Sequence, residues 1–150
     1  MSLSTEIMTA MKEAMKAKDQ NALTSLRAVK SAILLAQTES GAKQELTEEQ
    51  ELKILQKLVK QRKDSAKIFA EQGREDLAEP ELAQAQVIAK FLPEQMDNDA
   101  IAAIVNEVIA ATGAVGMKDM GKVMGQVNAR VAGKADGVTV AGLVKAALNK

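Results

Sequence analysis

The amino-acid sequence has no histidine, no cysteine, no tyrosine and no tryptophan. Histidine and cysteine supply the usual general bases, thiolate nucleophiles and zinc ligands, so their absence excludes the commonest forms of catalysis. Disulfide bonds are excluded too, which fits a reducing compartment. Phe69 and Phe91 are the only aromatic residues among 150, too few for a β-sandwich or β-barrel.

Other catalytic arrangements are also missing. Ser25, Ser31 and Ser65 fall within predicted helices, without a glycine-rich turn to present a nucleophile. The sequence lacks the Gly-x-x-x-x-Gly-Lys-Ser/Thr loop of a P-loop nucleotide site. The dense carboxylates of residues 48–51 are interpreted as first-turn residues that the helix dipole favours, rather than as a metal site. We therefore expect no cofactor, no metal and no catalysis by the chain alone.

Long apolar segments are absent as well. No apolar run approaches the ~18 residues that a membrane-spanning helix needs. Near the N-terminus, Met8, Met11 and Met15 alternate with charged residues, so no signal-peptide core is present. We expect a soluble, cytoplasmic protein that has no membrane partner.

Apolar residues recur at helical spacing along most of the chain, which predicts an all-α protein. Pro80 is expected to open a helix, after a turn at residues 74–78, because proline is tolerated in the first turn. Thr47 and Gln50 form a capping-box pattern at another helix start. The helices are predicted at residues 3–17, 19–41, 47–73, 80–92, 97–112, 116–131 and from about 139 to 145.

The spacing also predicts which side chains are buried. The apolar side of the first helix is predicted to consist of Ile7, Met8, Met11 and Met15. That of the second helix is predicted to consist of Leu23, Leu26, Val29, Ile33 and Leu34. In the sixth helix the predicted core stripe is Met117, Met120, Met124, Val127 and Val131.

The chain changes character after Pro93, where a polar, turn-prone segment follows the fourth helix. We place a domain boundary there. The prediction is an N-terminal four-helix, bundle-like domain of residues 1–95 and a C-terminal three-helix domain of residues 96–150.

Basic residues gather in the last third of the sequence. From residue 113 onward, six basic residues face two acidic ones, in a chain of zero net charge. Lys118 and Lys122 lie four residues apart and are expected to face outward from one helix. Gly121 and Gly125 each weaken a helix interior by about 1 kcal/mol, which indicates close approach by another helix or a ligand.

Lys134 lies in a predicted loop between Gly133 and Gly137, where a lysine and backbone amides can meet a phosphate. The alternative is a plain helix–loop–helix turn with solvent-facing lysines. A secondary set of basic residues could form a phosphate-binding surface, or could simply belong to solvated helix surfaces. Its members are Arg27, Lys30, Lys60, Arg62 and Arg74.

Six segments that run in order along nearly the whole chain resemble the YqeY family. They are residues 26–32, 60–65, 73–77, 92–95, 119–124 and 133–137. That family is similar to the C-terminal region of GatB, the B subunit of the tRNA-dependent amidotransferase that amidates Glu-tRNA(Gln) or Asp-tRNA(Asn). There, this helical region holds tRNA, while phosphorylation and glutamine hydrolysis take place elsewhere. The resemblance implies a four-helix bundle followed by a three-helix tail.

The leading hypothesis is a non-catalytic protein that binds tRNA or a tRNA-processing assembly. Phosphate contacts are assigned to Lys118, Lys122, Arg130 and Lys134, with Gly121, Gly133 and Gly137 allowing close approach. One alternative is a protein–protein adaptor whose partner packs against Gly121 and Gly125. Another is an accessory subunit that joins amidotransferase subunits and assists glutamine-dependent amidation in trans. Carbon–nitrogen ligase activity attaches to the chain only through this family association, because the nucleophile and phosphorylating segments are missing.

Overall fold

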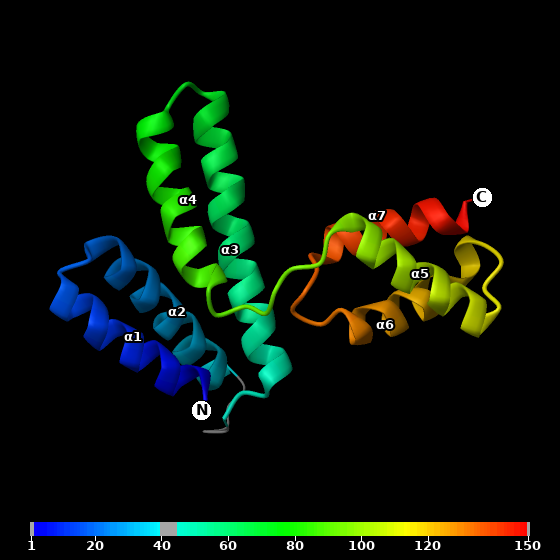
Figure 1. Cartoon of the computed structure of the whole chain (residues 1–150), viewed down its shortest axis with the longest axis horizontal. Coiled ribbons are helices and arrows are strands. Elements are labelled where there is room, and N and C mark those ends of the chain that lie inside the picture. Colours follow the sequence, from blue (N-terminus) through cyan, green and yellow to red (C-terminus); the bar gives the residue numbers. More distant parts are fainter. Residues whose placement is uncertain (1, 40–44, 150) are drawn as a thin grey trace. The chain divides into compact units, whose positions relative to one another are not determined.

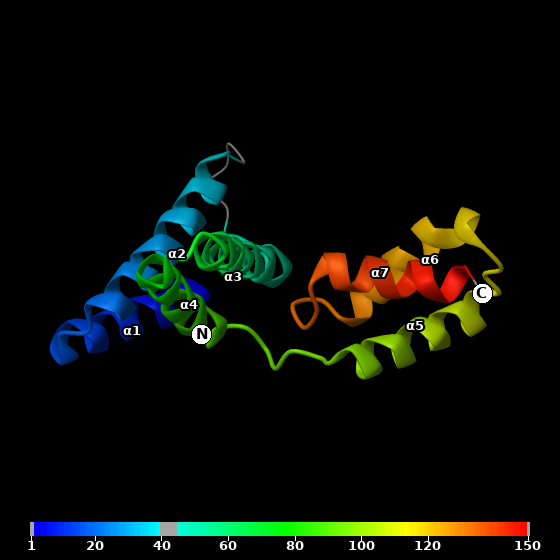
Figure 2. The same ribbon diagram turned by 90° about the horizontal axis from the view of Figure 1, so that it is seen from above.

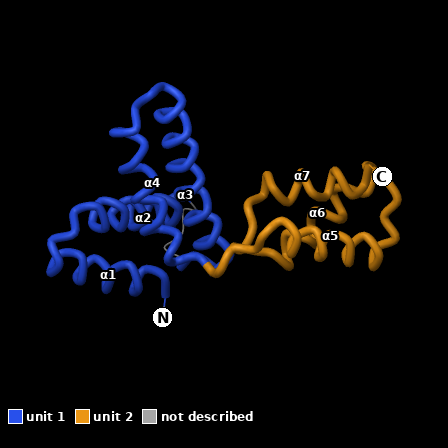
Figure 3. Tube along the Cα trace, turned by 45° about the horizontal axis from the view of Figure 1, so that its top comes forward, with its two compact units in different colours: residues 1–92 blue, residues 93–150 orange. Residues whose placement is uncertain are grey.

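The structure is a computed structural model that describes residues 2–39 and 45–149. Every regular element in those ranges is a helix, which confirms the all-α prediction. The chain divides into two compact units, residues 1–92 (unit 1) and residues 93–150 (unit 2), as Figure 3 shows. The division lies three residues before the boundary at residue 95 that the sequence predicts.

Unit 1 is built from two helical hairpins. The first pairs α1 with α2, the second pairs α3 with α4, and α2 contacts the other three helices (Figure 1). The predicted stop of the second helix at Gly41 lies outside the described residues. The helices are α1 (Leu3–Ala17), α2 (Gln20–Glu39), α3 (Glu48–Glu71) and α4 (Glu75–Ala89).

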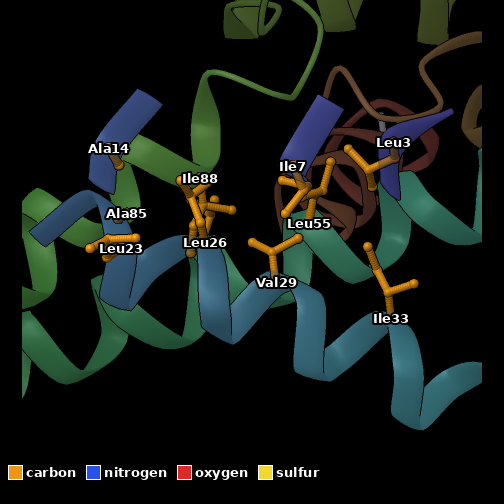
Figure 4. Close-up of a cluster of buried hydrophobic side chains, with 11 residues drawn as sticks. Leu3, Ile7, Ala14, Leu23, Leu26, Val29, Ile33, Leu55, Ala85 and Ile88 are labelled. Atoms are coloured by element: carbon orange, nitrogen blue, oxygen red, sulfur yellow. The ribbon is translucent and has the colours of Figure 1, made fainter. Parts of the chain in front are cut away.

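The core of unit 1 is aliphatic. Leu26 and Val29 of α2 lie at its centre, together with Ile7 of α1, Leu55 of α3 and Ile88 of α4 (Figure 4). The capping box expected at the start of α3 is present, since Thr47 and Gln50 each bond the backbone N–H of the other. Helical period and cap together therefore position α3 correctly from sequence.

For three side chains the prediction of a place in the core is wrong. Met8, Met15 and Leu34 are each more than half exposed. Each directly follows a buried residue, and one residue rotates the helix by about 100°. The period locates the apolar stripe but not its edge, and these side chains lie just beyond that edge.

The fourth helix begins earlier than predicted. It starts at Glu75, so Pro80 lies inside it, and residues 75–78 are helical rather than a turn. The negative charges of Glu75 and Asp76 in the first turn interact favourably with the helix dipole, and Ala78 is fully buried. Packing and charge in this first turn stabilise the helix despite the hydrogen bond that proline removes.

Replacing Pro80 with alanine tests this account. Pro80 is exposed, so the change restores a helical N–H without disturbing the core. Pro80→Ala should raise the free energy of unfolding of unit 1 by about 2 kcal/mol, because proline's helix penalty exceeds its stiffening of the unfolded chain. Urea unfolding followed by circular dichroism measures the difference, with Glu79→Ala as a near-neutral control. Unchanged or lower stability would contradict the account.

Unit 2 contains three helices and a short 3₁₀ turn. The elements are α5 (Asn98–Thr112), η1 (Met117–Asp119), α6 (Met120–Arg130) and α7 (Gly137–Leu148). Each of the three α-helices contacts the other two (Figure 2). The fully buried residues of this core are Ile101, Val105, Val108, Val123, Val127, Val131, Val140, Val144 and Leu148.

The sixth helix differs from its prediction in two ways. Its first turn is 3₁₀, so Lys118 lies in η1 and Lys122 in α6. Met117, predicted to be buried, is 41% exposed, whereas Val123, which was not predicted, is fully buried. The tighter 3₁₀ turn changes the direction of Met117 relative to the helix that follows.

The helices of unit 2 are rich in apolar residues. Within residues 2–39 and 45–149, no single helix is long and apolar enough to cross a membrane. Taken together, α5 and the η1–α6 segment meet the length and composition expected of a membrane span, but the pair is bent by 97°. Their buried valines pack against α7.

Glu51, in the first turn of α3, has a shifted pKa. The backbone N–H of Leu3, at the start of α1, lies near its carboxylate. Burial raises the pKa of Glu51 above its usual 4.5, as do the negative charges of Glu48, Glu6 and Glu45, whereas the Leu3 N–H opposes the rise. The folded state therefore disfavours the ionised carboxylate.

This shift predicts a pH dependence of stability. Because the folded pKa lies above the unfolded value, the contribution of Glu51 is fully present below about pH 4.5 and is lost as pH rises through the folded pKa. Glu51→Gln keeps an acceptor for the Leu3 N–H but does not titrate. Between pH 4 and pH 7, urea unfolding should show the wild type losing more stability than the variant. Parallel pH curves would show that Glu51 is not responsible.

Candidate functional site

The predicted site lies on η1, α6 and the turn that follows α6. Lys118 and Lys122 are exposed, and no ion pair among the described residues involves either of them. The turn before α6 is held by the Asp119 carboxylate, which accepts a hydrogen bond from the Val115 N–H at 3.1 Å. Val123 and Val127 anchor the opposite side of α6 in the core. The two lysines therefore project from a fixed surface.

Gly121 and Gly125 lie beside Lys122 on this exposed surface. A Cβ at either position would meet no atom within 4 Å. The sequence predicted close approach by another helix or by a ligand, and within unit 2 no helix approaches these glycines. They leave a strip of bare backbone next to the lysines, which we call the glycine strip.

Arg130, at the end of α6, is bound to another part of unit 2. Its Nη2 lies 2.6 Å from Oε2 of Glu107 on α5. Both side chains are about half exposed, so the ion pair adds little stability and can exchange partners. Arg130 is thus engaged with α5 through one of its guanidinium nitrogens.

The turn between α6 and α7 is held by backbone hydrogen bonds. The Lys134 N–H donates a hydrogen bond to the Val131 carbonyl, and the Lys134 carbonyl accepts one from the Met96 N–H, both at 2.8 Å. The Gly133 carbonyl accepts a hydrogen bond from the Gln95 side chain, also at 2.8 Å. Gly133 is buried at φ 75°, a left-handed conformation that favours glycine. The role of Gly133 is therefore to form the turn, and the Lys134 side chain is exposed beside it.

The N-terminus of α7 already holds a carboxylate. Asp136 caps the helix by accepting a hydrogen bond from the Val138 N–H at 3.4 Å, and Gly137 is the first helical residue. An anion at this helix end would face the negative charge of Asp136. Gly137 is thus part of the first turn of α7, and a Cβ at this position would point into open space.

Charge in unit 2 is balanced, with six basic and six acidic residues in residues 93–150. Four of the acidic residues precede residue 113, whereas all of the basic residues follow it. The positive charge is therefore local to the part of the unit formed by η1, α6, α7 and their connecting turns.

A comparison with protein-family models identifies the family. The model described as Yqey-like protein matches residues 4–148. The chain belongs to this family. The resemblance seen in the sequence is thereby confirmed at the level of the YqeY family, over nearly the whole chain.

Two curated relatives of this YqeY-like chain are similar over about half of it. Altered inheritance of mitochondria protein 41 of Clavispora lusitaniae is 40% identical over 82 residues, which cover 55% of this chain and 46% of that protein. An uncharacterised protein of Schizosaccharomyces pombe is 34% identical over 86 residues, 57% of this chain and 68% of that protein. The match thus spans about half the length of the first relative.

The secondary basic residues of the YqeY-like chain contact different neighbours. Arg62 is half buried, and its guanidinium donates hydrogen bonds to the Gln84 side chain and the Leu58 carbonyl, both at 3.2 Å. It therefore joins α3 to α4. Lys60 pairs with Asp64 along α3, at 2.8 Å.

Arg74 forms a local ion pair at the start of α4. It binds both carboxylate oxygens of Asp76, which raises the pKa of Arg74 and lowers that of Asp76. Arg27 and Lys30 are exposed on α2. Arg74 is thus engaged by a local contact, whereas Arg27 and Lys30 belong to a solvated helix surface.

Sequence reasoning missed two residues that shape the YqeY-like site. Asp136 was detectable, because it directly precedes a helix start and is a strong N-cap type. Glu107 carries no such signal, because it lies 23 residues from Arg130 and only the packing of α5 against α6 brings the two together.

Two glycine substitutions test this description. Gly125→Ala should raise the free energy of unfolding of unit 2 by about 1 kcal/mol, because the new methyl group enters open space and alanine favours the helix. Gly133→Ala should lower it by about 1–2 kcal/mol, because its φ is 75°. Urea unfolding of both variants provides the measurement. A destabilising Gly125→Ala would mean that α6 packs against something at that position.

Proposed function

We propose that this YqeY-like protein is a non-catalytic accessory protein that binds tRNA through unit 2. The observation that carries the proposal is the surface of η1 and α6, where the exposed Lys118 and Lys122 lie next to the glycine strip. The helices of unit 2 leave that surface uncovered. Family membership adds the resemblance to a helical region that holds tRNA in GatB. A cytoplasmic location is part of the proposal. The name of the Clavispora lusitaniae relative places that protein in mitochondria, where tRNA also occurs.

The contacts follow from the chemistry of these groups. Lysines attract phosphate as point charges and carry no sequence information. Because Gly121 and Gly125 have no side chains, a phosphate backbone can approach the helix closely. Lys134 supplies a further cation, and Arg130 joins by exchanging Glu107 for a phosphate. Without aromatic side chains at the site, bases are not read by stacking, so recognition depends on the shape and charge of the backbone.

The glycine strip also favours a second candidate function. An uncovered Gly-x-x-x-Gly pattern allows a partner helix to pack closely, as a protein–protein adaptor requires. On this reading the lysines border the partner and are not its main contacts. Assistance to an amidotransferase in trans is compatible with either surface role, since the chain would dock and the enzyme's own subunits would react.

A salt-dependent titration tests the tRNA proposal. Bulk tRNA is titrated with the wild type and with Lys118→Glu/Lys122→Glu, by fluorescence, at 25–200 mM salt. The variant should bind at least tenfold more weakly, and the slope of log affinity against log salt should fall by about 1.5 for two lost phosphate contacts.

The matched control for this titration is Lys12→Glu/Lys16→Glu on α1, a second pair of exposed lysines spaced four residues apart. It makes the same change in net charge in the other unit. Circular dichroism of all three proteins establishes that they are folded. If the wild type does not bind tRNA at low salt, or both variants lose affinity equally, the proposed site is wrong.

A further inference from the structure

The highest density of positive charge lies on α3, outside the proposed tRNA site. Between Lys53 and Lys67 the sequence has six basic residues and one acidic residue, Asp64. Five lysines follow one another at intervals of three or four residues, so that they share one side of the helix. These five, Lys53, Lys57, Lys60, Lys63 and Lys67, are all exposed, and together they form what we call the α3 lysine face.

The other side of α3 accounts for the fold. Leu55, Val59 and Ala66 are buried on it, and the one arginine of the segment, Arg62, turns inward to bind Gln84 of α4. The lysine face is therefore separate from the contacts that hold unit 1 together. Figure 1 shows the α3–α4 hairpin extending beyond the α1–α2 pair, so part of α3 has α4 as its main neighbour.

Most of the charge on this face is not neutralised. Lys53 pairs with Glu49 and Lys60 with Asp64, at 3.0 and 2.8 Å, through side chains that are more than half exposed. Within the described residues, Lys57, Lys63 and Lys67 take part in no ion pair. Exposed pairs of this kind are weak, so a stronger anion can displace the carboxylates.

The composition of the face decides which partner fits. The exposed residues between Lys53 and Lys67 are five lysines, Gln61 and Asp64, and the first exposed apolar side chain beyond them is Ile68. A surface with a single apolar residue at its end does not insert into a membrane or form the hydrophobic centre of a protein interface. The 14 residue steps extend over about 21 Å of helix, a length on which one strand of a duplex presents about six phosphates.

We propose that the α3 lysine face is a second nucleic-acid contact, which binds the phosphate backbone without reading bases. The choice of ligand rests on the proposed function, whereas the surface itself is in the other unit. The α3 contact accounts for its own part of the affinity and of the salt dependence.

The test removes the three lysines that have no ion pair. Lys57→Gln/Lys63→Gln/Lys67→Gln is compared with Lys12→Gln/Lys16→Gln/Lys90→Gln, which changes three other exposed lysines of unit 1 by the same charge. The full-length proteins are titrated with bulk tRNA, with a DNA duplex and with polyglutamate across a salt series. Circular dichroism and urea unfolding establish that each variant is folded.

The α3 variant should bind tRNA about tenfold more weakly than the wild type, with a salt slope lower by about 2, while the control stays within twofold. An equal loss with the DNA duplex assigns the face to phosphate backbones in general, and a loss with tRNA alone assigns it to RNA. An α3 variant that matches the control overturns the proposal. A loss that appears with polyglutamate but not with tRNA also overturns it, because the face then serves an acidic protein.

A second copy of the chain is the other competing occupant, because the first two turns of α4 expose the carboxylates Glu75, Asp76 and Glu79. Sedimentation at low salt tests it, and a wild-type dimer that the α3 variant abolishes overturns the proposal.

The proposed tRNA site in unit 2 and the α3 lysine face can fail separately. If only Lys118→Glu/Lys122→Glu weakens binding, the α3 face is wrong; if only the α3 variant does, the site in unit 2 is wrong; and if the wild type binds no nucleic acid, both are wrong.

Discussion

Burial of aliphatic side chains between helices is the interaction on which both units depend. Among the described residues the only buried polar side chain is Ser25, whose hydroxyl donates to the Asn21 carbonyl at 2.8 Å within its own helix. The cores are otherwise made of leucine, isoleucine, valine and alanine. Because hydrophobic burial is non-directional, neither core requires an ionised group. The charged residues of the chain are thus left on the surface, where their positions are open to a binding role.

Arginine and lysine have different roles on that surface. Three of the four arginines are held by neighbours within the chain: Arg62 by Gln84, Arg74 by Asp76 and Arg130 by Glu107. The rigid guanidinium fork suits such fixed contacts, whereas the flexible, compact lysine ammonium does not lose much by staying in solvent. Exposed lysines on η1, α6 and α3 are therefore the groups left for an external anion. Point charges of this kind favour binding that is strong at low salt and indifferent to sequence.

The helices were predictable because their signals are local. The cap at Thr47, the Asp97 cap of α5 and the helical period each depend on residues within one or two turns. Pro80 misled the prediction, because the acidic first turn of α4 and the packing of Ala78 outweigh it, and that packing is not visible in the local sequence. Exposure of Lys118 and Lys122 could be foreseen from the opposing stripe of core valines and methionines. The Arg130–Glu107 pair could not, since it joins two helices.

The glycine strip connects stability with function. Gly121 and Gly125 each cost α6 about 1 kcal/mol relative to alanine, and no turn, positive φ or neighbouring atom within unit 2 requires them. Gly133 differs, since its left-handed backbone explains its presence. The proposed partner, which needs the bare backbone, would account for a cost that nothing within unit 2 offsets. Because Lys118 and Lys122 border the strip, an anionic backbone gains both close approach and charge there, whereas a neutral helix gains only the first. The lysines therefore favour nucleic acid over a protein helix as the partner at this surface.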